Sequence, residues 1–154
     1  MRAFTINPTV NETISAAIGK LRITVVYDNN PYKEGLTTSW GFACVIKGAE
    51  KTILFDTGGN SAVLLNNMQQ LGMDAKEIDV VVLSHIHGDH VGGLNGFLQV
   101  NRNVTVYLPA TFPLEFKESL KHAGVKTVEM NDPARIRKAF IQPEFWETGS
   151  RNRP

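Results

Sequence analysis

Residues 84–90 read SHIHGDH, and they follow directly on DVVVL at residues 79–83. An uninterrupted apolar run of this length is typical of an interior strand that is covered on both faces. Three of the four histidines of the chain therefore lie on a loop at the carboxyl end of a buried strand. Ligand-binding residues of layered α/β proteins usually occupy this position, because the strand anchors the loop while the loop backbone turns toward the site.

The spacing of these histidines and of the adjacent aspartate predicts a metal site. Imidazole nitrogen and carboxylate oxygen are donors that suit zinc, manganese or iron(II). In an extended segment His85 and His87 project to the same side, so both reach one cation. Asp89 and His90 reach a second cation beyond a bend at Gly88, where glycine gives the backbone freedom. The alternative is a polar surface loop that happens to be rich in histidine, and the motif and its strand-end position disfavour it.

A metal in this loop implies a reaction that uses activated water. The cation would lower the pKa of a bound water from about 15.7 toward about 7, so that hydroxide forms at neutral pH. The same cation would stabilise negative charge that develops on oxygen. We expect one or two Zn²⁺ ions, with Mn²⁺ or Fe²⁺ as alternatives, and we assign Asp89 a catalytic role in addition to its role as a ligand.

The regions that flank the loop predict an α/β protein in which strands and helices alternate. Strands are expected at residues 22–27, 41–47, 51–55, 79–83, 104–108 and 125–130. A first helix is expected to begin at Asn60 or Ser61 and to stop at Gly72, and a second to cover residues 112–123. The loop at residues 28–39 contains Asn, Pro and Gly, and it either supplies turns or faces the substrate with Asp28, Asn29, Asn30 and the adjacent Trp40.

Composition limits the partners and the location of the chain. The 154 residues match one domain, and 16 basic against 15 acidic side chains give a formal net charge of +1. This balance argues against nucleic acid and against an anionic membrane as partners, and it leaves a small-molecule substrate. The single cysteine, Cys44, lies in an apolar run where a small buried side chain is expected. Without a signal peptide or a membrane span in the sequence, we expect a cytoplasmic protein.

The segment SHIHGDHVGG at residues 84–93 resembles the HxHxDH signature of the metallo-β-lactamase superfamily. The resemblance implies an αββα sandwich with one or two metal ions. It also implies that His85 and His87 bind the first metal and that Asp89 and His90 bind the second. Asp56, in LFDTGG, matches the aspartate that supports the site in this superfamily. From the residues alone, Asp56 is equally well explained as a turn residue at the end of a strand.

Two longer segments resemble one branch of that superfamily. They are VVYDNNPYKEGLTTSWGFACVI at residues 25–46 and KTILFDTGGNSAVLLNNMQQLG at residues 51–72. The branch includes the dihydropteroate-synthase-like enzymes of archaeal methanopterin synthesis, the 7,8-dihydropterin-6-methyl-4-(β-D-ribofuranosyl)aminobenzene 5'-phosphate synthases. The resemblance therefore offers two activities: hydrolysis of a small ester, lactone or phosphate-bearing molecule, or condensation of a pterin-methyl diphosphate with an aminobenzene ribofuranosyl phosphate.

The chain departs from the superfamily pattern after residue 130, where the further His and Asp ligands of the family are missing. The remaining histidine, His122, falls late on a predicted amphipathic helix, where an exposed side chain is expected. We therefore expect an N-terminal extension at 1–20, the N-terminal half only of the sandwich at 21–132, and an irregular basic tail at 133–154. A half-sandwich would expose one face of its sheet, and two copies would associate through that face. Besides hydrolysis and condensation, a third possibility is therefore an inactive metal-binding fragment that needs the missing C-terminal half.

Overall fold

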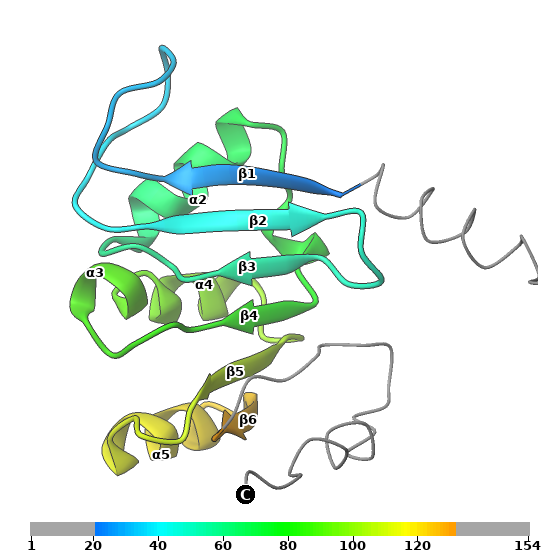
Figure 1. Ribbon diagram of the computed structural model, residues 1–154, viewed down its shortest axis with the longest axis vertical. Helices are drawn as coiled ribbons and strands as arrows, with labels where there is room; N and C mark the ends of the chain where they lie inside the picture. Colours follow the sequence, from blue (N-terminus) through cyan, green and yellow to red (C-terminus); the bar gives the residue numbers. More distant parts are fainter. Residues whose placement is uncertain (1–20, 132–154) are drawn as a thin grey trace, which may run out of the picture.

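The apolar runs form a single six-stranded sheet in the computed structural model, which describes residues 21–131 (Figure 1). The strands are β1 (Arg22–Tyr27), β2 (Ala43–Lys47), β3 (Ile53–Phe55), β4 (Val80–Val82), β5 (Thr105–Pro109) and β6 (Lys126–Met130). The expected α/β architecture is therefore confirmed. The expectations for the extension at 1–20 and the tail at 133–154 lie outside the described residues.

The strands lie in the sheet in the same order as in the sequence. β1, β2 and β3 are antiparallel neighbours, and the predicted hairpin between β2 and β3 turns at Gly48, whose φ is 95°. From β3 to β6 the neighbours are parallel, so each of these connections must cross over the sheet. Crossovers between parallel strands are right-handed almost without exception, and a sheet that grows in one direction places all of them on the same face.

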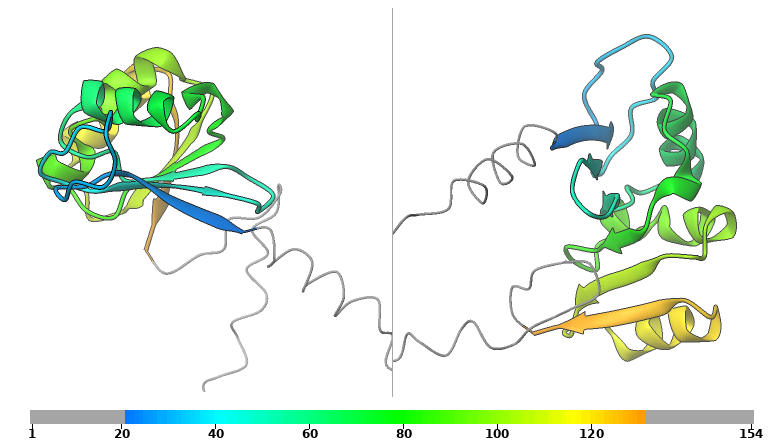
Figure 2. Two further views of the ribbon diagram at one scale, coloured as in Figure 1. Left: turned by 90° about the horizontal axis from the view of Figure 1, so that it is seen from above. Right: turned by 90° about the vertical axis from the view of Figure 1, so that its right-hand side faces the viewer.

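The helices follow from this topology and cover one face of the sheet (Figure 2). They are α2 (Ser61–Gln70), the 3₁₀ turn η1 (Ala75–Glu77), α3 (Gly88–Val91), α4 (Leu94–Val100) and α5 (Leu114–His122). Asn60 caps α2 as predicted, because its side chain accepts hydrogen bonds from the backbone of Ala62 and Val63. Gly72 ends the segment in a left-handed conformation with φ of 68°.

The hydrophobic core lies between the sheet and this helix layer. Strand residues that face the helices are fully buried, among them Val45, Leu54, Val81 and Val106. The helices contribute Leu64, Met68, Leu94, Phe97 and Leu120 to the same cluster. A fully buried aliphatic or aromatic side chain stabilises the fold by about 1.5–3 kcal/mol, so this layer holds the sheet together.

The apolar run at residues 79–83 predicts a strand that is covered on both faces. Within residues 21–131, helices cover only one face of the sheet (Figure 2). β4 does lie in the interior of the sheet, between β3 and β5. On the face without helices, Val80 is buried at 4% exposure whereas Val82 is half-buried. The continuous apolar run therefore indicates a strand that is apolar on both faces. In the described part of the chain, helices pack against only one of these faces. No helix in that part is long and apolar enough to cross a bilayer.

A buried asparagine fastens the long loop at residues 28–42 to the helix layer. The side-chain amide of Asn67, on α2, donates to the carbonyl oxygens of Val26 (3.0 Å) and Thr37 (2.8 Å). Its side-chain oxygen accepts from the backbone N–H of Thr37 (2.9 Å). One side chain therefore satisfies three backbone groups on two other segments, and the position of the loop depends on it.

Replacement of Asn67 by alanine tests this role. Asn67→Ala leaves three backbone groups without their partner, and we expect the free energy of unfolding to fall by about 2–4 kcal/mol. Urea denaturation followed by circular dichroism measures the change. Asn66→Ala, on the same helix, is the matched control and should cost less than about 0.5 kcal/mol. Equal losses for the two variants would contradict the assignment.

Candidate metal centre

The histidine loop begins where β4 ends, at the carboxyl edge of the parallel part of the sheet. β3 and β4 are parallel neighbours, and Phe55 pairs with Val82. Asp56, directly after β3, and Ser84, two residues after the end of β4, are therefore brought side by side. The sequence prediction that the histidines follow a strand end is confirmed, with one addition: Asp89 and His90 lie on the short helix α3.

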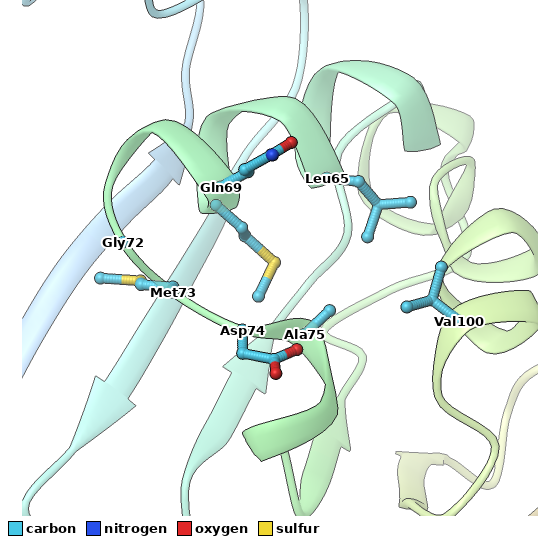
Figure 3. A pocket seen from close by; sticks show the side chains of 8 residues that line it. Leu65, Gln69, Gly72, Met73, Asp74, Ala75 and Val100 are labelled. Atoms are coloured by element: carbon cyan, nitrogen blue, oxygen red, sulfur yellow. The ribbon is translucent and has the colours of Figure 1, made fainter.

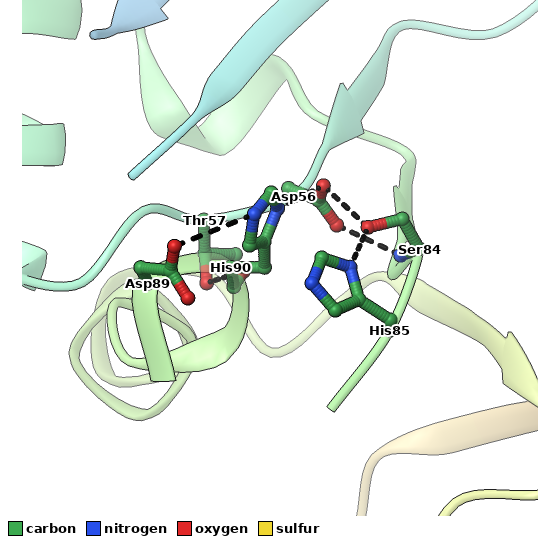
Figure 4. A network of polar contacts seen from close by, with 6 residues as sticks. All are labelled: Asp56, Thr57, Ser84, His85, Asp89 and His90. Carbon is green, nitrogen blue, oxygen red and sulfur yellow. Dashed lines mark hydrogen bonds and ion pairs between the residues drawn. The ribbon is translucent and has the colours of Figure 1, made fainter. Parts of the chain in front are cut away.

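Asp56 is the buried carboxylate of the site, at 1% exposure. Its Oδ1 accepts a hydrogen bond from the backbone N–H of Ser84 (2.8 Å), and its Oδ2 accepts one from the Ser84 hydroxyl (2.7 Å). Oδ2 also lies 2.8 Å from Nδ1 of His90 (Figure 4). Asp56 adopts a left-handed backbone with φ of 55°, so it is both a turn residue and the support of the histidine loop.

The hydrogen bonds around Asp56 determine which nitrogen of two histidines remains available. An ionised carboxylate only accepts, so the Ser84 hydroxyl must donate its proton to Asp56. The Ser84 oxygen, 2.8 Å from Nδ1 of His85, then accepts from that nitrogen. Nδ1 of His90 donates to Asp56 in the same way. Both rings therefore carry the proton on Nδ1, and both Nε2 lone pairs are left for a metal.

The structure brings the four predicted ligands together. The ring centroid of His85 lies 4.6 Å from that of His87 and 4.0 Å from that of His90. The Asp89 carboxylate lies 3.6 Å from Nε2 of His90, which is beyond hydrogen-bonding range. The side chains of Asp89 and His90 are 28% and 21% exposed, so solvent and a small molecule reach them.

A divalent metal fits these residues by donor type and by hydrogen bonding, but the coordination sphere is not closed. Within residues 21–131, no group of three or more His, Cys, Asp or Glu side chains is arranged to hold a metal ion. His85, His87 and His90 contact one another instead of surrounding a common point. His122 is exposed near the end of α5, as the sequence predicts, and its Nδ1 lies 2.8 Å from the carbonyl oxygen of Glu118.

The sequence does not reveal how the backbone of Asp89 and His90 is held. The N–H and the hydroxyl of Thr57 both donate to the carbonyl oxygen of His90, at 2.8 and 2.9 Å. The N–H of Phe42 donates to the carbonyl oxygen of Asp89 at 3.3 Å. These contacts join segments far apart in the sequence, and the cluster of glycines around them is the only signal that points to such close packing.

Gly41 is one of the glycines on which this packing depends. Its φ is 132°, and a Cβ atom there would collide with the carbonyl oxygen of Asp89. The sequence interpretation instead gave the special conformation to Gly88, and this is wrong. Gly88 begins α3 without a positive φ, and a Cβ atom at Gly88 would meet nothing within 4 Å. The loop bends there because a helix starts, so glycine is not required.

The loop that contains Trp40 borders the site. Asp28 accepts hydrogen bonds from the backbone of Asn29 and Asn30, which is turn chemistry as the first alternative predicted. Trp40 is 73% exposed, and its carbonyl oxygen would be in contact with any Cβ atom placed on Gly59. A role for Trp40 in facing substrate stays a prediction.

A separate apolar pocket of about 470 Å³ lies in the helix layer (Figure 3). Its lining includes Leu65, Met68, Met73 and Val100. The ionisable residue among its lining residues, Asp74, accepts a hydrogen bond from the backbone of Lys76 and caps η1. None of the histidines lines this pocket, so we assign the chemistry to the histidine loop.

Cys44 is buried at 6% exposure, as the sequence predicts. Burial raises the pKa of the Cys44 thiol, and the negative charge of Asp56 raises it further. The thiol is therefore protonated at neutral pH, which disfavours a role as a nucleophile.

The model of the metallo-beta-lactamase superfamily matches residues 41–150, which is more than half of the chain. The chain belongs to this superfamily. The match includes the site described above, and the predicted family and fold class are thereby confirmed.

Three similar proteins place this membership in context. The 7,8-dihydropterin-6-methyl-4-(beta-D-ribofuranosyl)-aminobenzene-5'-phosphate synthase of Methanocaldococcus jannaschii is 30% identical, over 73% of this chain and 46% of its own length. The crystal structure of Tm1679, a metal-dependent hydrolase of the beta-lactamase superfamily, superposes with a TM-score of 0.58 at 25% identity, over 77% of this chain and 45% of that one. The structure of YhfI from Bacillus subtilis, a metallo-beta-lactamase fold protein, superposes with a TM-score of 0.56 at 19% identity. The superposition covers 77% of this chain and 49% of YhfI. The chain thus spans about half the length of these relatives.

The support that Asp56 gives to His90 is testable through metal affinity. Asp56→Asn keeps the shape of the side chain but removes the charge that holds the proton on Nδ1 of His90. We expect zinc affinity to fall by about 10- to 100-fold, as for other outer-shell partners of metal ligands. Competition with a chromogenic zinc chelator measures the affinity. Asp74→Asn is the matched control, because asparagine retains the capping oxygen. If the zinc affinity of Asp56→Asn is unchanged, Asp56 does not support His90 as a metal ligand.

Proposed function

We propose that this chain carries the metal-binding residues of a metal-dependent hydrolase that acts on a small ester, lactone or phosphate-bearing substrate. The observation that supports this most directly is the hydrogen bonding of His85 and His90. Their Nδ1 atoms are engaged by Ser84 and Asp56, and Nε2 of His90 lies 3.6 Å from the partly exposed carboxylate of Asp89. Structural histidines have no need of this arrangement, whereas metal ligands do.

The residues of the site have distinct proposed roles. His85, His87, Asp89 and His90 would hold one or two Zn²⁺ ions, with Mn²⁺ or Fe²⁺ as alternatives. A bound cation of this kind makes water acidic enough to supply hydroxide at neutral pH. The Asp89 carboxylate, partly exposed on α3 next to His90, would orient the attacking water and accept its proton. Asp56 keeps His90 in one tautomer and in one orientation.

A second candidate function is a transferase reaction. The Methanocaldococcus jannaschii relative named as a synthase favours it, because it is 30% identical over most of this chain. In that reaction, the amine-bearing ring of an aminobenzene ribofuranosyl phosphate would displace diphosphate from a pterin-methyl diphosphate. A cation held by the same donors would then stabilise the leaving diphosphate instead of activating water.

A third candidate is a metal-binding chain that is active only after assembly with further polypeptide. The unclosed coordination sphere within residues 21–131 supports it, and so does the length of the relatives. We propose a cytoplasmic location for each of these functions, on the ground that the single cysteine is buried and unpaired.

Metal content and turnover, measured together, test the hydrolase proposal. We expect the purified chain to bind zinc and to hydrolyse p-nitrophenyl acetate or bis(p-nitrophenyl) phosphate, and a chelator should abolish the hydrolysis. His87→Ala should lower zinc affinity by at least about 10-fold and remove hydrolysis. His122→Ala, the matched control at an exposed histidine, should change neither.

The same measurements separate the three candidates. Zinc binding that depends on His87, without hydrolysis of either ester, would favour the chain that needs further polypeptide. Release of diphosphate from a pterin-methyl diphosphate, dependent on the aminobenzene substrate, would favour the transferase. Hydrolysis that persists in His87→Ala and in the presence of chelator would reject all three.

A further inference from the structure

Ser84 lies between the buried carboxylate of Asp56 and the ring of His85. Its hydroxyl oxygen is 2.7 Å from Oδ2 of Asp56 and 2.8 Å from Nδ1 of His85. Nδ1 of His90 lies 2.8 Å from the same Oδ2 atom. One carboxylate oxygen therefore contacts His90 directly and reaches His85 through Ser84, so that the four side chains form a continuous chain of hydrogen bonds (Figure 4).

The hydroxyl of Ser84 is not needed to fasten the histidine loop to the end of β3. The backbone N–H of Ser84 already donates to Oδ1 of Asp56 at 2.8 Å, and any residue except proline has this N–H. Just before it, the N–H of Leu83 donates to the carbonyl oxygen of Tyr107 at 2.9 Å. The contact that the hydroxyl adds, and that the backbone does not supply, is the one to the ring of His85.

The direction of this chain of hydrogen bonds is set by Asp56. A hydroxyl has one proton, and an ionised carboxylate takes it, so the Ser84 oxygen accepts the Nδ1 proton of His85. An amide at position 56 would reverse the order. Its oxygen would stay at Oδ1 to accept the N–H of Ser84, and its NH₂ group at Oδ2 would donate to the Ser84 hydroxyl. That hydroxyl would then donate to Nδ1 of His85.

We propose that Ser84 is a positioning residue that relays the charge of Asp56 to His85. The inference rests on the proposed function, in which His85 and His90 bind metal through Nε2. One buried carboxylate then presents both rings to the metal centre, His90 directly and His85 through a hydroxyl. The two rings are therefore coupled: loss of the Asp56 charge alters both of them, whereas loss of the Ser84 hydroxyl alters His85 alone.

Two-bond ¹H–¹⁵N correlation spectra test the relay, because they show which ring nitrogen of each histidine carries the proton. The sample is the complete 154-residue chain, freed of metal by a chelator and held at about pH 8, where imidazole is neutral. We expect both rings to carry the proton on Nδ1. In Asp56→Asn both should carry it on Nε2. In Ser84→Ala, His90 should keep its Nδ1 proton while His85 shows a mixture of the two tautomers.

A double variant and two controls separate the relay from a general disturbance of the loop. Asp56→Asn combined with Ser84→Ala should move the proton of His90 only, because His85 is no longer connected to position 56. Ser84→Thr retains a hydroxyl and should keep the proton of His85 on Nδ1. Ser119→Ala, the matched control, removes a hydroxyl that donates to the carbonyl oxygen of Phe116 and should change neither ring. Circular dichroism verifies that each variant is folded.

Zinc affinity, measured by competition with a chelator, supplies the second readout. Ser84→Ala should bind zinc about 10-fold more weakly, and Ser84→Thr should bind it as the unchanged protein does. The relay is wrong if His85 keeps its Nδ1 proton in Asp56→Asn, a test that remains if Ser84→Ala does not fold. Weaker zinc binding by Ser84→Thr, equal to that of Ser84→Ala, also overturns it. The tautomers are read without metal or turnover, so the expected shifts without any hydrolysis would reject the hydrolase and retain the relay.

Discussion

The buried carboxylate of Asp56 is the interaction on which the metal centre depends. It binds the first residue of the histidine loop through both a backbone and a side-chain hydrogen bond, and it binds His90 on α3 at the end of that loop. A carboxylate at 1% exposure is costly to bury unless its oxygens are satisfied, and here three donors satisfy them. The left-handed backbone at Asp56, which aspartate tolerates better than most residues, aims the carboxylate at Ser84.

Strand and helix positions were largely predictable because they depend on local patterns. The strand at residues 22–27 and the helix that starts at Ser61 were found as predicted, since alternation and an Asn cap are visible in the sequence. β2 begins later than predicted, at Ala43, because the N–H of Phe42 is used to hold Asp89 and not to pair with a strand. The helix α4 was missed, since LNGFLQV is short, contains a glycine and has no capping side chain.

The donor residues of the site were also predictable, but their organisation was not. The motif places His85, His87, Asp89 and His90 in one segment, so their proximity follows from the spacing alone. The contacts of Asp56, Thr57 and Phe42 with that segment join residues more than 25 positions apart. No periodicity encodes such contacts, because they appear only once β3 and β4 are parallel neighbours. Gly41, which would collide with Asp89 if it had a Cβ atom, was therefore expected only as the first residue of the strand at 41–47.

The apolar face and the position of the site have a common origin in the topology. Because successive parallel strands are added in one direction with crossovers of one hand, every helix is placed on the same side of the sheet. The same order brings the ends of β3 and β4 together and creates the site. A chain that builds the histidine loop in this way cannot also cover the second face with the same crossovers. Any cover for that face therefore comes from outside the described residues, and Ile23, Val25 and Phe55 are apolar side chains that it would meet.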